Sequence, residues 1–144
     1  MLFVHATCVA LDDVAVLLRG APGSGKSDLA LRLIDGGAQL VADDQVELSA
    51  AGGALLARPP AVLAGLLEVR GLGILRFPHR AEAPLGLVVD LVASERVERL
   101  PLPGRTELLG VAVPRLALAP FEASAPAKLR QAVALCRAPD RLAS

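Results

Sequence analysis

Aromatic side chains are nearly missing from this 144-residue sequence, which has no Trp, no Tyr and three Phe. Because 53% of the residues are nevertheless hydrophobic, the core has to be built from Leu, Val, Ala and Ile. That composition favours a buried parallel or mixed β-sheet covered by helices. Charge of one sign is not in excess either, with 15 basic and 15 acidic residues and no basic stripe interleaved with aromatics. A nucleic-acid-binding protein is therefore not expected.

Long hydrophobic runs are also lacking, since charges interrupt every apolar run well short of a bilayer span, and residues 1–5, which have no basic region, are not expected to form a leader sequence. The two cysteines, Cys8 and Cys136, lie at opposite ends without a CxxC partner. A disulfide is the alternative, but buried free thiols in a reducing cytosol are favoured. We expect a cytoplasmic protein with no membrane contact and one domain over residues 1–144. The apolar surplus indicates that some of it is buried between subunits.

Hydrophobic periodicity and turn residues predict alternating strands and helices, hence an α/β fold. Helices are expected over 26–35, ending at Gly36-Gly37, and over 123–137. The expected strands cover 2–11, 14–19, 39–42, two short segments around a hairpin turn near 50–53, 85–92 and 108–113. Residues 95–99 and the Pro-rich stretch after them are expected to form an exposed connection.

The segment GAPGSGKS matches the pattern G-x-x-x-x-G-K-[ST] at every specified position. Glycines allow backbone N–H groups to turn toward phosphate oxygens, and the following helix directs its positive end at them. A flexible turn is the alternative, but the strand before and the helix after support nucleotide binding. The predicted phosphate-binding residues are Gly20, Ala21, Pro22, Gly23, Ser24, Gly25, Lys26 and Ser27.

Two adjacent carboxylates, Asp43 and Asp44, end the next apolar strand. In an α/β sheet this position lies beside a bound magnesium nucleotide. One carboxylate can hold the water shell of the metal, and the other can accept a proton from an attacking hydroxyl. A pair of solvated turn residues is an equal alternative on position alone.

The segments LVADDQVEL (40–48) and LLEVRGLGILRF (66–77), placed after this loop, resemble the catalytic domain of HPr kinase/phosphorylase. The resemblance covers almost the whole chain. It implies a P-loop fold of the type shared with phosphoenolpyruvate carboxykinase, rather than that of adenylate-kinase-like enzymes. The family transfers phosphate from ATP to a serine of HPr, a phosphocarrier protein of the bacterial sugar phosphotransferase system, and its members form hexamers.

The resemblance also implies roles for single residues. His5 matches the catalytic histidine, although a lone His among apolar neighbours is by itself more often a core residue. Asp44 matches the group that accepts the substrate proton, with Asp43 tuning it. Ser27 and Glu68 match the metal ligands, Glu68 being otherwise a surface charge. Lys26, Arg70 and Arg99 match residues that stabilise phosphate charge.

The function implied is therefore that of a short-form HPr serine kinase, which uses ATP and Mg²⁺ and lacks the N-terminal domain of longer members. It is expected to form a homo-oligomer, and specifically a hexamer. Where the family has an Arg- and Gly-containing loop near its C-terminus, only residues 113–118 are available, so the phosphorylase activity is expected to be weak. A kinase of a small metabolite and a non-catalytic ATP-responsive module are the alternatives.

Overall fold

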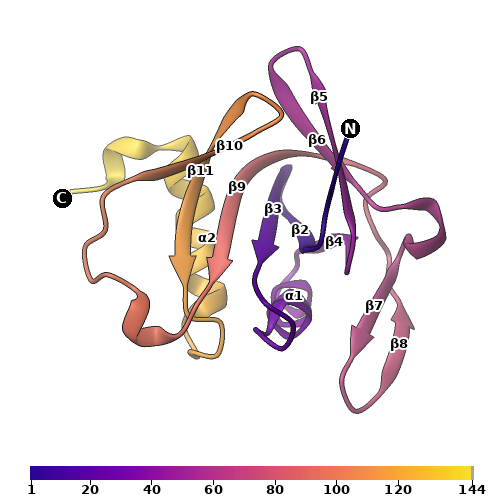
Figure 1. Cartoon of the computed structure of the whole chain (residues 1–144). Coiled ribbons are helices and arrows are strands. Elements are labelled where there is room, and N and C mark those ends of the chain that lie inside the picture. Colours follow the sequence, from indigo (N-terminus) through magenta and orange to yellow (C-terminus); the bar gives the residue numbers. More distant parts are fainter. Residues whose placement is uncertain (144) are drawn as a thin grey trace.

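The computed structural model describes residues 1–143 as one mixed β-sheet, two helices and a separate hairpin (Figure 1). Within these residues, no helix is long and apolar enough to cross a membrane. The helices are α1 (Lys26–Asp35), α2 (Ala125–Arg137) and the short 3-10 helices η1 (Ala61–Leu63), η2 (Ser94–Arg96) and η3 (Pro139–Arg141). The strands are β1 (Leu2–Val4), β2 (Thr7–Leu11), β3 (Val14–Arg19), β4 (Gln39–Ala42), β5 (Val46–Ala51), β6 (Ala54–Arg58), β7 (Leu66–Val69), β8 (Gly73–Arg76), β9 (Ala83–Leu91), β10 (Gly104–Leu108) and β11 (Val111–Leu118).

Strand β3 lies near the centre of the large sheet, between β9 on one side and β2 on the other. It is parallel to β9, which in turn is parallel to β11, so the carboxyl ends of these three strands meet at one edge. Strands β2 and β4 continue the sheet on the other side in antiparallel pairs. In this strand order, the glycine-rich loop that follows β3 lies between the carboxyl ends of β4 and β11.

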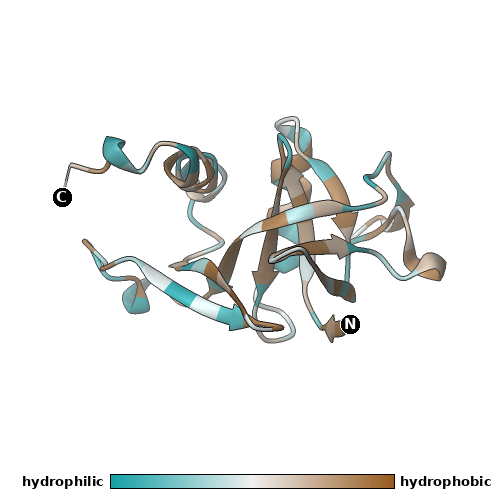
Figure 2. Ribbon diagram, turned by 90° about the horizontal axis from the view of Figure 1, so that it is seen from above, coloured by the Kyte–Doolittle hydropathy of each residue, from teal (hydrophilic) through white to brown (hydrophobic). Residues whose placement is uncertain are grey.

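Alternation along the central strands gives each face of the sheet its own core. Val16 and Leu18 pack with the buried residues of α1 and α2, whereas Ala15 and Leu17 pack on the opposite face beside β5. The central strands are mainly hydrophobic in Figure 2. The prediction of a parallel or mixed sheet is confirmed. Within the described residues the buried core consists mostly of Leu, Val and Ala, and the Ile residues expected there are not buried.

The helix over residues 26–35 is confirmed at both ends. Gly36 caps it, and the backbone N–H groups after Asp35 donate to carbonyl oxygens of the last helical turn. Two predicted strands are wrong in extent. The segment 2–11 is split at His5 and Ala6, because β1 pairs with β5 while β2 pairs with β3 and β4. The segment 108–113 contains a hairpin turn at Leu109 and Gly110 that joins β10 to β11.

Both cysteines are free, as predicted, but only Cys8 is buried. Burial raises the pKa of the Cys8 thiol to about 12, so this thiol stays protonated and unreactive at neutral pH. Cys136 is exposed near the end of α2, which corrects the expectation of two buried thiols.

An ion-paired cluster crosses the three parallel strands near their carboxyl ends. Arg19 donates two hydrogen bonds to the Asp90 carboxylate, of 2.8 and 3.1 Å, and Arg115 donates a third. Burial on its own raises the pKa of Asp90, but the hydrogen bonds and charges of both arginines outweigh it and hold the pKa below its usual value. The cluster therefore stabilises the edge of the sheet that carries the loop.

Asp90→Asn is expected to lower the melting temperature at pH 7 by more than it does near pH 3. A carboxylate with a lowered folded-state pKa contributes stability above its unfolded value of about 3.9, and the contribution is lost as pH falls through the folded pKa. Thermal unfolding of wild type and variant at both pH values measures this, with the exposed Asp140→Asn as the control. An equal destabilisation at the two pH values would contradict it.

Candidate nucleotide-binding and catalytic site

The glycine-rich loop, residues 20–27, leaves the end of β3 and runs into the first turn of α1. Gly23 and Gly25 have φ values of 80° and 96°, a left-handed backbone conformation that residues other than glycine adopt only with strain. Gly25 caps α1 without any side-chain hydrogen bond to the helix end. The first amide N–H groups of α1 therefore lack intrahelical partners and are available to an anion.

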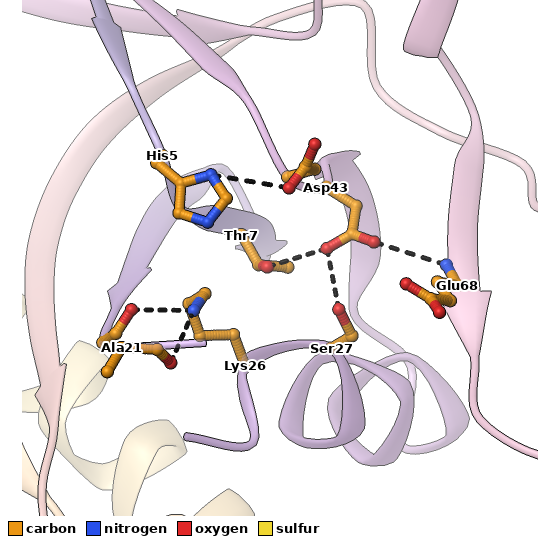
Figure 3. A network of polar contacts seen from close by, with 9 residues as sticks. His5, Thr7, Ala21, Lys26, Ser27, Asp43 and Glu68 are labelled. Carbon is orange, nitrogen blue, oxygen red and sulfur yellow. Dashed lines mark hydrogen bonds and ion pairs between the residues drawn. The ribbon is translucent and has the colours of Figure 1, made fainter. Parts of the chain in front are cut away.

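Two further features of the loop fit a phosphate group. The Ser24 hydroxyl oxygen is buried and has no hydrogen-bond partner within residues 1–143. A Cβ atom on Gly20 would lie 2.4 Å from that oxygen, so any larger residue there would displace the Ser24 side chain. The Lys26 ammonium donates to the carbonyl oxygens of Gly20 and Ala21, at 2.7 and 3.1 Å, and is held inside the curve of the loop (Figure 3).

Asp43, which follows β4, joins three elements through its carboxylate (Figure 3). It is 8% exposed. One carboxylate oxygen accepts hydrogen bonds from the hydroxyls of Thr7 and Ser27, at 2.8 and 2.9 Å. The other accepts a longer one, 3.3 Å, from the backbone N–H of Glu68. The loop, β2 and β7 are thus held together at a single buried carboxylate.

Asp44 is directed elsewhere, although it is the next residue. Its φ of 71° turns the backbone into the left-handed region, and its carboxylate lies 3.4 Å from the Nδ1 atom of His5. The side chains of His5 and Asp44 are 59% and 66% exposed. His5 is therefore a surface residue beside Asp44 and not a core residue, and Asp44 presents an accessible carboxylate beside the buried Asp43.

A cleft of about 350 Å³ opens at the N-terminal end of α1. It is lined by Gly23, Gly25, Lys26, Ser27, Asp28, Leu31, Glu68, Val69, Arg70 and Phe121. A somewhat larger cavity of about 410 Å³ lies at the other end of α1 and contains none of the predicted site residues. The smaller cleft is the one that chemistry favours, because it joins the loop to acidic and basic side chains.

Most of the residues predicted from the sequence thus come together, and one does not. Lys26, Ser27 and Glu68 meet at the cleft, with Arg70 on its wall and the His5–Asp44 pair beside Asp43. Arg99 is exposed in the connection after β9 and makes no hydrogen bond or ion pair within the described part of the chain. Thr7 and the anchoring role of Asp43 were not predicted. The adjacent acids were a signal for Asp43, whereas nothing local singles out Thr7.

The sheet order, the loop and the helix that follows it define the class of protein: an α/β domain of the P-loop nucleotide-binding type. The family model described as HPr Serine kinase C-terminal domain matches residues 2–135. The chain therefore belongs to the HPr serine kinase C-terminal domain family, which confirms the resemblance drawn from residues 40–48 and 66–77.

Individual relatives agree with this assignment. An HPr kinase/phosphorylase of Bordetella pertussis is 42% identical over 127 residues, which cover 80% of this chain and 41% of the relative. One from Clostridium tetani is 44% identical over 75 residues, or 52% of this chain and 25% of the relative. The solved structure of the Hpr(Ser) kinase/phosphatase from Coxiella burnetii matches with a TM-score of 0.87 at 28% identity, covering 99% of this chain and 100% of that one. The chain thus spans about two fifths of the Bordetella relative and a quarter of the Clostridium relative.

Proposed function

We propose that residues 1–144 form one cytoplasmic kinase domain that transfers phosphate from ATP to a serine of an HPr-type phosphocarrier protein. The Ser27–Asp43 hydrogen bond of 2.9 Å is the observation that carries the proposal. It links the phosphate-binding loop to the acidic pair, so that a phosphate on the loop and a hydroxyl beside Asp44 would lie in one site. The family membership supplies the substrate class.

ATP would place its phosphates on residues 20–27. The backbone N–H groups at the start of α1 and the Ser24 hydroxyl would donate hydrogen bonds to them. Lys26 would exchange its two carbonyl partners for β- and γ-phosphate oxygens, and Arg70 on the cleft wall would stabilise charge on the transferred group.

A magnesium ion fits the donor set near Ser27, but the protein alone would not complete its coordination. Among residues 1–143 no group of three His, Cys, Asp or Glu side chains is arranged as a metal site. Mg²⁺ commonly takes one or two carboxylates and fills the remaining positions with phosphate oxygens and water. Ser27 and Glu68, with Asp43 behind Ser27, would hold it, and it would supply positive charge beside the phosphates.

Asp44 is the group that we assign as general base. Its exposed carboxylate would take the proton of the serine hydroxyl while the hydroxyl oxygen forms a bond to the γ-phosphorus. The bond from that phosphorus to the bridging oxygen breaks, and ADP leaves. His5, 3.4 Å from Asp44, would orient the carboxylate, whereas Asp43 is already occupied by three hydrogen bonds.

Incubation of the purified chain with labelled ATP, Mg²⁺ and an HPr-type protein tests the proposal. Label on a serine of the protein is the expected result. Label on a small molecule supplied in a cell extract would favour a metabolite kinase instead. Tight ATP binding with no transfer to any acceptor would favour a nucleotide-responsive module.

Phosphorolysis is expected to be weak in the same assay. Residues 113–118, the segment available in place of the Arg- and Gly-containing loop, lie inside β11 and not in a loop. Residues 119–124, which follow β11, contain neither Arg nor Gly. Phosphorylated HPr-type protein mixed with inorganic phosphate should therefore release little pyrophosphate, and rapid release would contradict this expectation.

A homo-oligomer, most simply a hexamer, is part of the proposal. The β7–β8 hairpin exposes Leu72, Ile74 and Leu75, by 74%, 69% and 36%, although apolar side chains of this size are usually buried. Multi-angle light scattering at micromolar concentration should give a multiple of the 14.8 kDa chain mass. A monomer mass would contradict the proposal, and Ile74→Glu is expected to shift the distribution toward smaller species.

A further inference from the structure

We propose that Phe121 is the surface on which the nucleobase of the bound nucleotide stacks. This inference rests on the nucleotide binding proposed above and adds a residue that no sequence motif marks. Phe121 is one of three phenylalanines in a chain that lacks Trp and Tyr. It lines the cleft at the N-terminal end of α1, and it is 69% exposed.

The ring lies directly against the phosphate-binding loop. A Cβ atom on Gly25 would be 2.8 Å from the Cζ atom of Phe121, so a side chain there would displace the ring, and the φ of 96° by itself favours glycine. One edge of the ring therefore packs on the loop, and the large exposed fraction leaves the rest open to a ligand. A planar ligand that leaves the loop toward α2 would meet this aromatic surface.

The segment that carries Phe121 is fixed on both sides of the ring. Ala119 and Pro120 are buried, and the carbonyl oxygen of Pro120 accepts a hydrogen bond from Arg32 of α1. The same Arg32 donates to Asp28 at 3.0 Å, in the first turn of α1. On the other side, the chain turns into α2 through the hydrogen bond from the Ala125 N–H to the Glu122 carbonyl, at 3.0 Å. The backbone on either side of the exposed ring is thus held in place.

The sheet order gives the direction of the nucleotide. The reacting end of the triphosphate belongs near Ser27 and Asp43, which lie on the β2–β4 side of the loop. The nucleoside must extend away from that end, toward the β9–β11 side. There β11 leads into the loop of Phe121, and Figure 1 shows α1 between this loop and the β7–β8 hairpin. Phe121 is the apolar side chain that the cleft lining offers to a base on that side.

The chemistry at Phe121 predicts stacking without a strict choice of base. An aromatic ring stacks on the face of any nucleobase, and a discriminating site would need hydrogen-bond donors and acceptors aimed at the base edge. The ring is therefore expected to strengthen binding of nucleotides over that of inorganic polyphosphates, and to do so similarly for ATP and GTP.

Isothermal titration with Mg-ATP and with Mg-tripolyphosphate separates the base from the phosphates. Phe121→Ala is expected to weaken ATP binding by roughly 5- to 150-fold, which is the range for loss of one base–aromatic stack, and to leave tripolyphosphate binding unchanged. Val62→Ala is the control, because Val62 is 85% exposed but lies on η1 outside the cleft lining. Circular dichroism establishes that both variants are folded.

The outcomes distinguish this inference from the function on which it rests. If wild type binds tripolyphosphate as tightly as ATP, or if Phe121→Ala leaves ATP binding unchanged, the stacking role is wrong while the phosphate-binding loop stands. An equal loss for both ligands in Phe121→Ala would mean that the ring supports the loop, which also overturns it. If wild type binds neither ligand, nucleotide binding itself is wrong, and the inference falls with it.

A tryptophan at the same position gives an independent measurement. Because the chain contains no Trp, Phe121→Trp would place a single indole at the cleft. Saturating Mg-ATP and Mg-GTP are expected to quench its fluorescence by direct stacking, whereas saturating Mg-tripolyphosphate should leave it unchanged. Equal quenching by all three ligands would report a movement of the loop and would overturn the assignment.

Discussion

Lys26→Ala should nearly abolish phosphoryl transfer while leaving the fold intact. Lys26 is the cation inside the curve of the loop, where its ammonium donates to Gly20 and Ala21. Removal of one preorganised donor to a transition-state charge typically costs ~10²–10³-fold in rate, and here a full positive charge is lost as well. The backbone N–H groups of the loop remain, so nucleotide affinity should fall by much less. Single-turnover transfer from labelled ATP and a nucleotide titration measure the two effects.

Lys128→Ala is the matched control for this prediction. Lys128 is the other lysine of the chain, half exposed on α2 and 3.6 Å from Glu122. A surface ion pair of this kind contributes at most ~1 kcal/mol, and transfer should stay close to wild type. Unchanged transfer in Lys26→Ala, with this control also unchanged, would mean that residues 20–27 form a structural turn only.

The glycine-rich loop and α1 could be predicted because their determinants are local. Glycines at fixed spacing and a helix that runs from Lys26 to Asp35 with Gly36 as its cap are all encoded within 17 residues, 20–36. The split of residues 2–11 could not be predicted, since both halves are apolar and only pairing with β5 separates β1 from β2. The turn at Leu109 was missed because a leucine with a φ of 49° is an uncommon turn residue.

The arrangement of the acidic pair depends on contacts that are distant in sequence. Thr7 reaches Asp43 because β2 pairs with β4 in the register Cys8–Ala42, which no local pattern reveals. The sequence placed both acids at the end of a strand, but the left-handed backbone of Asp44 sends the two side chains to different partners. The structure gives Asp43 an anchoring role, and its tuning of Asp44 stays a prediction.

This division of roles makes Asp43 and Asp44 separable by the same substitution. Asp43→Asn would keep one oxygen that can accept from Thr7 and Ser27, but its NH2 group would face the Glu68 N–H as a second donor, and the negative charge behind Ser27 would be lost. Because Asp43 holds Ser27 in place, we expect Mg-ATP affinity to fall by roughly 10- to 100-fold, as is typical when a group supporting a metal ligand is lost. Titration with Mg-ATP measures this directly.

Asp44→Asn should have the opposite profile. The amide keeps the size of the side chain and its place beside His5, but it cannot take the proton of the serine hydroxyl. General-base assistance is typically worth ~10²–10⁴-fold, and single-turnover phosphorylation should slow by about that much with Mg-ATP affinity nearly unchanged. If Asp44→Asn instead loses affinity and rate in equal proportion, Asp44 is a metal ligand. If it loses neither, the serine proton goes elsewhere, and the assignment of Asp44 as the base is wrong.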